Sequence, residues 1–325
     1  MTMYLRDFAA QRQFYIGTAV NTRAFVDGET TYCEVLQREF NMLVAENMMK
    51  FGELSPAPNT YNWTTTDKLM DFAEANDMKV RGHTLVWHQQ LPRWLTSGTW
   101  TPEAVRALLE EHIKTVVGRY RGRVWAWDVV NEAVADTGGD RTDSFWYQHL
   151  GPDYIALAFR WAHEADPDAL LYYNDYEAEA LSPKSDTIFE LVRRLKQDGV
   201  PVHGVGWQMH LTEGWRATSE HRQNAERLHD LGVELSMTEM DVRIGTPPTA
   251  VQLVSQAESY RDAVELALEH FVALVAWGFS DKYSWIPGFR PGLGAALPFD
   301  EEYAPKPAYD AIKEVLAGES SGPRV

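Results

Sequence analysis

The sequence has little cysteine, little positive charge and no long apolar run, and each shortage excludes a class of protein. A single cysteine, Cys33, excludes an intrachain disulfide and a zinc site made of several cysteines. Because no run of about 18 apolar residues occurs, there is no candidate transmembrane helix. The chain has 30 basic and 47 acidic residues, and its net charge of −17 argues against nucleic acid or an anionic membrane as a partner. This balance fits a neutral polymer as substrate.

The chain also lacks a secretory signal and a low-complexity linker. Its start, MTMYLRDFAAQRQ, is polar, so we expect a cytoplasmic protein, or a secreted one whose leader was removed. Only the end, AGESSGPRV, has the composition of a disordered segment. The sequence therefore predicts one catalytic domain over residues 1–317 and a disordered tail over residues 318–325.

Short apolar runs alternate with longer segments of helical periodicity along the chain. Thr101–Pro102 and Ser182–Pro183 are typical of helix starts, and Gly199 and Gly232 of helix ends. This alternation predicts an α/β protein with a single (β/α)8 TIM barrel. An open doubly wound sheet is the alternative, but no glycine-rich phosphate loop follows the first strand. The predicted strands span residues 14–20, 42–45, 79–86, 124–130, 170–174, 204–208, 234–239 and 274–279.

Unusual polar and aromatic residues occur at or near the ends of seven of these strands. Active sites of (β/α)8 barrels lie at the C-terminal ends of the strands, so these side chains are predicted to share one rim. They are Glu46, Asn47, His83, Trp87, Asn131, Glu132, Asn174, Gln208, His210, Glu239, Asp241, Trp277 and Trp285.

Glu132 and Glu239 follow strongly apolar strands that lie nearly opposite each other in an eight-strand ring. Two carboxyl groups across a barrel mouth are what glycoside hydrolysis needs: a protonated one for the leaving oxygen and an ionised one for the anomeric carbon. Asn131 is in a position to hold a substrate hydroxyl. His210 could hold Glu239 as its carboxylate, with Asp241 orienting the imidazole. A single glutamate at a strand end is more often a salt-bridge partner. Two glutamates with amides, indoles and histidines on the same rim favour catalysis instead.

The histidines show no metal-binding pattern. His83 and His88 are five residues apart, and neither HExxH nor CxxC spacing occurs. The sequence therefore predicts no catalytic metal.

Aromatic residues are the one excess, with 12 tryptophans, 14 tyrosines and 13 phenylalanines. A tryptophan-rich core and a groove lined with flat rings for sugars are both consistent with this number. Trp125, Trp127 and Trp161 are expected in the core, whereas the tryptophans at the predicted rim are expected to stack on sugar rings.

Six motifs occur in order along nearly the whole chain: AENMMK, GHTLVWHQQLPRW, WDVVNEA, YYNDYE, GVGWQMH and LSMTEMDV. On these motifs the sequence resembles glycoside hydrolase family 10, the endo-β-1,4-xylanases. The resemblance implies hydrolysis of internal β-1,4 bonds of xylan or xylooligosaccharides, with the sugar chain as partner and no cofactor.

The resemblance also implies roles for residues in the matching motifs. Glu132 is similar in position to the family's general acid/base and Glu239 to its nucleophile. His210 and Asp241 resemble the partners that keep the nucleophile ionised, and Asn131 resembles the ligand of the sugar 2-hydroxyl. Further substrate-binding residues are implied around the cleaved sugar (His83, Trp87, Gln208, Trp277 and Trp285), around the next sugar toward the non-reducing end (Glu46, Asn47, Lys50 and Gln90), at Asn174, and in the leaving-group half (Tyr176).

The family implies retention of configuration through a covalent xylosyl intermediate, which predicts carboxyl groups about 5–5.5 Å apart. The sequence departs from the family pattern at Met240, after the nucleophile, and at Asn59, where glycine is common; neither departure touches the chemistry. Two alternatives stay open. One is a lectin-like barrel that binds xylan without cleaving it, and the other is a hydrolase with the same mechanism that acts on cellooligosaccharides.

Overall fold

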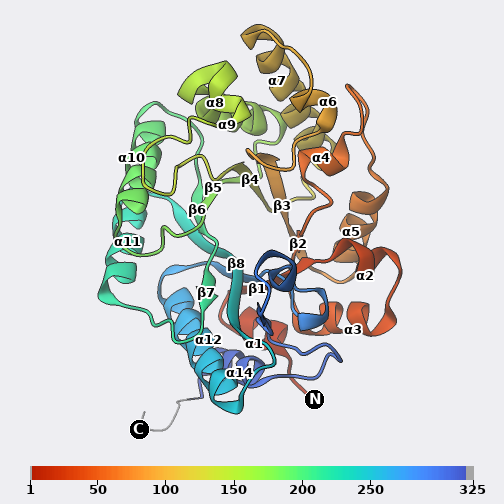
Figure 1. Ribbon diagram of the computed structural model, residues 1–325, viewed down its shortest axis with the longest axis vertical. Helices are drawn as coiled ribbons and strands as arrows, with labels where there is room; N and C mark the ends of the chain where they lie inside the picture. The colour runs from red at the N-terminus through yellow and green to blue at the C-terminus, as the bar shows by residue number, and fades with distance from the viewer. Residues whose placement is uncertain (1, 320–325) are drawn as a thin grey trace.

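The computed structural model describes residues 2–319 and contains a closed barrel of eight parallel strands (Figure 1). Each strand pairs with the next in the ring, and β9 pairs with both β8 and β1, which closes it. The predicted (β/α)8 barrel is therefore confirmed. Its strands are β1 (Tyr15–Val20), β2 (Met42–Ala45), β3 (Lys79–Val86), β4 (Ala126–Asn131), β5 (Leu170–Asp175), β6 (Gly204–Trp207), β8 (Glu234–Gly245) and β9 (Ala273–Ala276).

All eight predicted strands are present, but two have ends that the sequence did not indicate. Strand β8 continues to Gly245 because two short strands, β7 (His210–Thr212) and β10 (Leu293–Gly294), pair with its second half. Strand β9 ends at Ala276 rather than at residue 279, since Gly278 adopts a φ of 106° and turns the chain.

Helices surround the barrel on all sides (Figure 1). The predicted helix starts are confirmed, because Thr101 and Ser182 accept hydrogen bonds from backbone N–H groups of the first turn. The α-helices are α1 (Leu5–Gln11), α2 (Thr22–Val26), α3 (Thr30–Glu39), α4 (Phe51–Leu54), α5 (Thr64–Ala75), α6 (Arg93–Thr96), α7 (Pro102–Arg119), α8 (Phe145–Leu150), α9 (Tyr154–Ala165), α10 (Pro183–Gln197), α11 (Ser219–His229), α12 (Ala250–His270), α13 (Ile286–Phe289) and α14 (Pro307–Ala317); the 3-10 helices are η1 (Gly151–Asp153) and η2 (Asp281–Tyr283).

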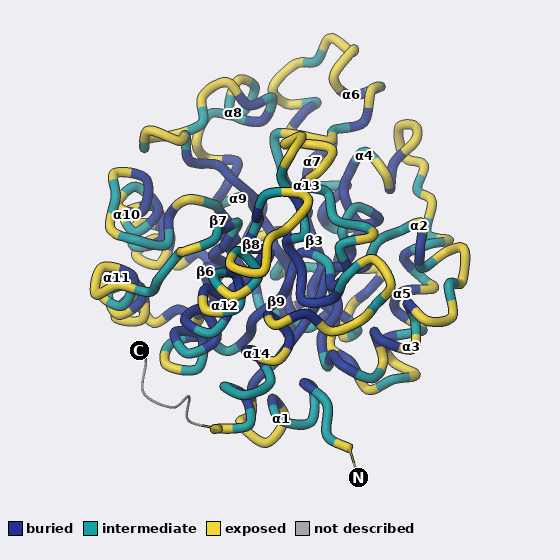
Figure 2. Tube along the Cα trace, turned by 60° about the horizontal axis from the view of Figure 1, so that its bottom comes forward, coloured by how far each residue is buried: buried dark blue, intermediate teal, exposed yellow. Residues whose placement is uncertain are grey.

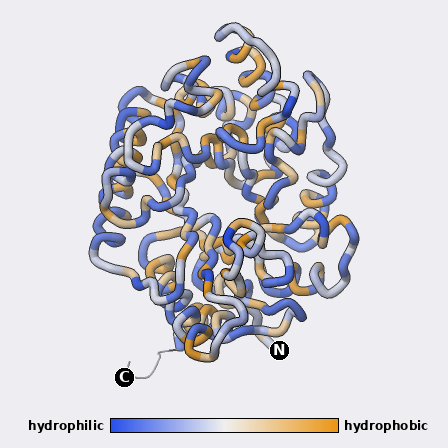
Figure 3. Tube along the Cα trace, in the orientation of Figure 1, coloured by the Kyte–Doolittle hydropathy of each residue, from blue (hydrophilic) through white to orange (hydrophobic). Residues whose placement is uncertain are grey.

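Burial follows the two-layer arrangement of the barrel. The strands and the inner helix faces are buried, while loops and outer faces are exposed (Figure 2), and hydrophobic and hydrophilic residues alternate along the helices (Figure 3). Trp127 and Trp161 are buried in the core as predicted, whereas Trp125 is half-buried against Tyr15. Within residues 2–319, no helix combines the length and apolar character needed to cross a membrane.

Of the predicted tail, only Gly318 and Glu319 belong to the described residues. Gly318 adopts a left-handed φ of 75° and ends α14, with its N–H donating to the carbonyl of Val315. Residues 320–325 lie outside the described residues.

Candidate active site

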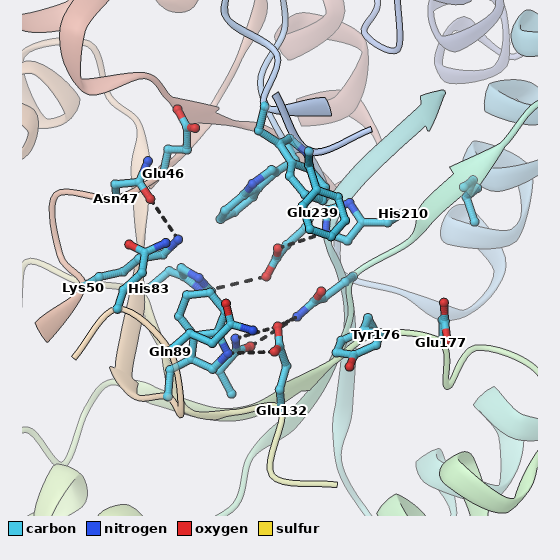
Figure 4. Close-up of a pocket in the computed structure, with 18 of the residues that line it drawn as sticks. Glu46, Asn47, Lys50, His83, Gln89, Glu132, Tyr176, Glu177, His210 and Glu239 are labelled. Atoms are coloured by element: carbon cyan, nitrogen blue, oxygen red, sulfur yellow. Dashed lines mark hydrogen bonds and ion pairs between the residues drawn. The ribbon is translucent and has the colours of Figure 1, made fainter. Parts of the chain in front are cut away.

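A cavity of about 660 Å³ opens at the C-terminal ends of the barrel strands. Of the residues that the sequence predicted for the site, all except Asp241 and Asn174 line this cavity. Glu239 extends into it from β8 and Glu132 from the segment just after β4, with Lys50 and Asn47 to one side and Tyr176 to the other (Figure 4). The parallel barrel thus brings together side chains that are far apart in the sequence.

Glu239 lies on β8 and is held as an anion by its neighbours. One carboxylate oxygen accepts a hydrogen bond from the amide of Asn174 at 2.8 Å, and the other lies 3.3 Å from Nε2 of His210. Burial acts to raise the pKa of Glu239, but the hydrogen bond with His210 and the imidazole of His83 outweigh it. The net pKa lies below the ordinary glutamate value, so this carboxyl group is ionised at neutral pH.

His210 lies between two carboxylates, since its Nδ1 is 3.0 Å from Asp241 Oδ2 and its Nε2 faces Glu239. Burial alone would lower the pKa of His210, but the charges and hydrogen bonds of Asp241 and Glu239 raise it to about 10. Asp241 lies behind the imidazole and also accepts the indole N–H of Trp285 at 2.9 Å. The imidazole is therefore a fixed cation, with both ring nitrogens acting as donors.

The raised pKa of His210 predicts a pH-dependent contribution to stability. The unfolded value is about 6.5, so the charged imidazole stabilises the fold fully below pH 6.5 and loses this effect as the pH rises through about 10. Between pH 6.5 and 9.5, we expect the wild type to lose roughly 3 kcal/mol more unfolding free energy than His210→Gln. Guanidinium unfolding curves at both pH values measure this difference. Equal losses in the two proteins would rule out the charged link.

Glu132 follows β4 and receives three hydrogen bonds from neutral donors. The indole of Trp87 donates to Oε2 at 2.7 Å, while the amides of Gln208 and Asn131 donate to Oε1 at 3.0 and 3.1 Å. The backbone of Glu132 has a φ of 58°, a left-handed conformation that costs about 1–3 kcal/mol in a residue with a side chain. Its N–H donates to the carbonyl of Asn174 at 2.9 Å, which helps to hold this conformation.

From the sequence, Asn174 is predicted among the substrate-binding residues. In the structure its side chain is completely buried and does not line the cavity. Its Nδ2 lies 2.8 Å from both Asn131 Oδ1 and Glu239 Oε1, and its side-chain oxygen Oδ1 accepts a hydrogen bond from the hydroxyl of Thr238. A Cβ atom on Gly206 would lie 2.2 Å from Asn174 Oδ1, so the glycine makes room for this amide. Asn174 therefore orients the two groups on either side of it.

A second polar cluster lies at the end of β2. Lys50 donates to Asn47 at 3.0 Å and lies 4.8 Å from the Trp87 ring centroid, and Glu46 accepts from Asn21 at 2.9 Å. Burial lowers the pKa of Lys50 and raises that of Glu46, although their opposite charges counter both effects. This cluster offers several donors and acceptors to the hydroxyl groups of a ligand.

Comparison with known proteins agrees with this geometry. The model of glycosyl hydrolase family 10 matches residues 5–315. The chain belongs to glycosyl hydrolase family 10. Endo-1,4-beta-xylanase B of Thermotoga neapolitana is 46% identical over 319 residues, which cover 96% of this chain and 91% of that protein.

Two solved structures resemble this family 10 chain closely. Native xylanase 10B from Thermotoga maritima is 48% identical, with a TM-score of 0.93 over 98% of this chain and 99% of that one. Xylanase 10B from Thermotoga petrophila RKU-1, in complex with xylobiose, is 47% identical, with a TM-score of 0.95 over 98% of both chains.

The cavity of this family 10 barrel includes residues that the sequence did not single out. They lie mostly in segments that follow strands and at the end of α13, where no periodicity marks a residue as facing inward. The sequence also did not single out Arg141 and Lys184. They contact the cavity residue Tyr176 but do not line the cavity themselves. A lysine in the first turn of a helix was one usable signal for Lys184. The additional lining residues are Gln89, Asp136, Glu177, Glu179, Leu211, Arg243, Phe289 and Arg290.

Among the described residues, no three His, Cys, Asp or Glu side chains lie together as a metal ion would require.

Proposed function

We propose that this family 10 chain is an endo-1,4-β-xylanase that hydrolyses internal β-1,4 bonds of xylan or xylooligosaccharides with retention of configuration. One observation carries the proposal: the carboxyl groups of Glu132 and Glu239 face the same cavity, and each is held by its own set of hydrogen-bond donors. His210 and His83 favour the ionised form of Glu239. Indole and amide donors hold the Glu132 carboxyl group in place. The xylanase names of the relatives and the xylobiose in the Thermotoga petrophila structure support the same substrate class.

In the first step, Glu239 attacks the anomeric carbon while Glu132 transfers its proton to the glycosidic oxygen. The bond from the anomeric carbon to that oxygen breaks, and a bond to the Glu239 carboxylate forms. The reducing-end part of the chain leaves as an alcohol. Asn174 and His210 stabilise this step because they hold Glu239 in place and favour its charge until the bond forms.

In the second step, Glu132 is ionised and removes a proton from water, whose oxygen attacks the same carbon. The ester bond to Glu239 breaks, and the product has the β configuration of the substrate. We assign the polar cluster of Glu46, Asn47, Lys50 and Gln90 to the sugar next to the reacting one. We also propose that residues 1–317 form a single catalytic domain.

Proton NMR during hydrolysis of xylopentaose tests the proposal. We expect internal cleavage with the β anomer formed first, followed by slow mutarotation. A first-formed α anomer would refute retention. Binding of xylopentaose without new reducing ends would support a lectin-like barrel instead, and faster cleavage of cellopentaose would reassign the substrate.

A further inference from the structure

Lys184 occupies a position where a lysine is unfavourable on general grounds. It is the second residue of α10, and the positive end of a helix dipole disfavours a cation there. Its side chain is only 2% exposed, so the ammonium group has also lost its hydration. A cation that is kept in spite of both effects calls for specific partners.

Those partners are an aromatic ring and two carboxylates, of which Asp136 is the farther at 3.9 Å. The Lys184 ammonium lies 2.9 Å from Asp175 Oδ1, at the end of β5, and 3.4 Å from the centroid of the Tyr176 ring. Asp175 also accepts the backbone N–H of Tyr176 at 2.9 Å and a hydrogen bond from Tyr173. One face of Tyr176 is therefore fixed against a desolvated cation, an arrangement in which cation–π attraction is strong.

The same network reaches the proposed acid/base. Arg141 donates to the hydroxyl of Tyr176 at 3.1 Å and to the backbone carbonyl of Glu132 at 2.8 Å. Tyr173 accepts the N–H of Ala133, the residue after Glu132, at 3.1 Å. The Tyr176 ring and the backbone that carries Glu132 are thus held by one set of contacts.

We propose that Lys184, paired with Asp175, is a positioning residue that fixes Tyr176 as a platform for the sugar departing in the first step. Lys184 does not line the cavity, whereas Tyr176 does, so it acts through the ring. A fixed ring stacks on the leaving sugar without first losing conformational freedom, and the glycosidic oxygen is then held at Glu132. This inference rests on the proposed xylanase function and deepens it.

The test compares two substrates that differ in the leaving group. In β-xylobiosyl fluoride the leaving fluoride is too small to reach Tyr176, whereas xylopentaose places sugars over it. For Lys184→Met, we expect kcat/KM on xylopentaose to fall about 10- to 100-fold, mainly through KM. On β-xylobiosyl fluoride it should stay within about twofold, because kcat/KM reports only the first chemical step.

Two further variants keep the test decisive. Lys196→Met removes a lysine from the same helix, α10, away from the cavity, and should match the wild type on both substrates. The double variant Lys184→Met with Asp175→Asn removes both buried charges together, so no unpaired carboxylate destabilises the fold. It should show the same split between substrates. Equal losses on both substrates, or no loss on xylopentaose, overturn the proposal. A wild type that leaves xylopentaose intact refutes the proposed function itself.

Discussion

Replacing Glu239 with alanine is expected to lower kcat on xylopentaose by about 10⁴- to 10⁶-fold, the range seen when an essential nucleophile is removed. The reason lies in the surroundings of Glu239: His210 and Asn174 hold its two oxygens. Within residues 2–319, no other carboxylate shares these two partners, and water in the space left by the side chain is a far weaker nucleophile. Steady-state release of reducing sugar measures the loss.

A covalent label separates this role from general damage to the site. A 2-deoxy-2-fluoro xylobioside should add its glycosyl mass to the wild type and leave Glu239→Ala unlabelled. Glu234→Ala is the matched control, because Glu234 is an exposed glutamate at the opposite end of the same strand, β8. It should keep wild-type labelling and turnover. More than about one per cent residual activity in Glu239→Ala would contradict the assignment, since the expected loss is far larger.

The second large effect concerns Glu132 and depends on the leaving group. Glu132→Ala removes the proton donor, so kcat/KM on xylopentaose should fall by about 10²- to 10⁴-fold, the usual contribution of general acid catalysis. The same variant should lose less than about tenfold on β-xylobiosyl fluoride, because fluoride leaves without a proton. Comparing the two substrates under the same conditions measures the contribution of the acid.

Azide provides the complementary readout for Glu132→Ala. An anion that needs no general base should enter the space left by the carboxylate, attack the covalent intermediate and yield β-xylobiosyl azide. The wild type should give no such product, because its ionised Glu132 repels anions. Equal losses on both substrates, with no azide product, would show that Glu132 supports the fold of the site rather than proton transfer.

The barrel and its two glutamates were predictable because each depends on a local pattern. Apolar runs marked the strands, and polar residues directly after them marked the rim, since parallel strands bring their ends together. Strand length was less predictable: β8 continues because β7 and β10 pair with it, and the sequence of β8 alone does not contain those partners.

The supporting contacts were mostly not predictable, since they depend on which side chains meet in three dimensions. Asn174 ends a strand just as Asn131 does, yet one is buried behind the cavity and the other lines it. Strand periodicity does not separate them, because the register shifts between Asp128 and Val130 where β4 pairs with β5. The left-handed backbone of Glu132 is likewise held by hydrogen bonds to other segments, at Arg141 and Asn174.

The contact between Gly206 and Asn174 bears on how this enzyme can be made more robust. Glycine within a strand weakens it, and a β-branched residue there would ordinarily be a simple improvement. Here any side chain would displace the amide that aligns Glu239 with Asn131. Heat resistance gained at position 206 would therefore be offset by lost turnover. Directed evolution for stability is better aimed at the outer helix faces, which are far from this contact.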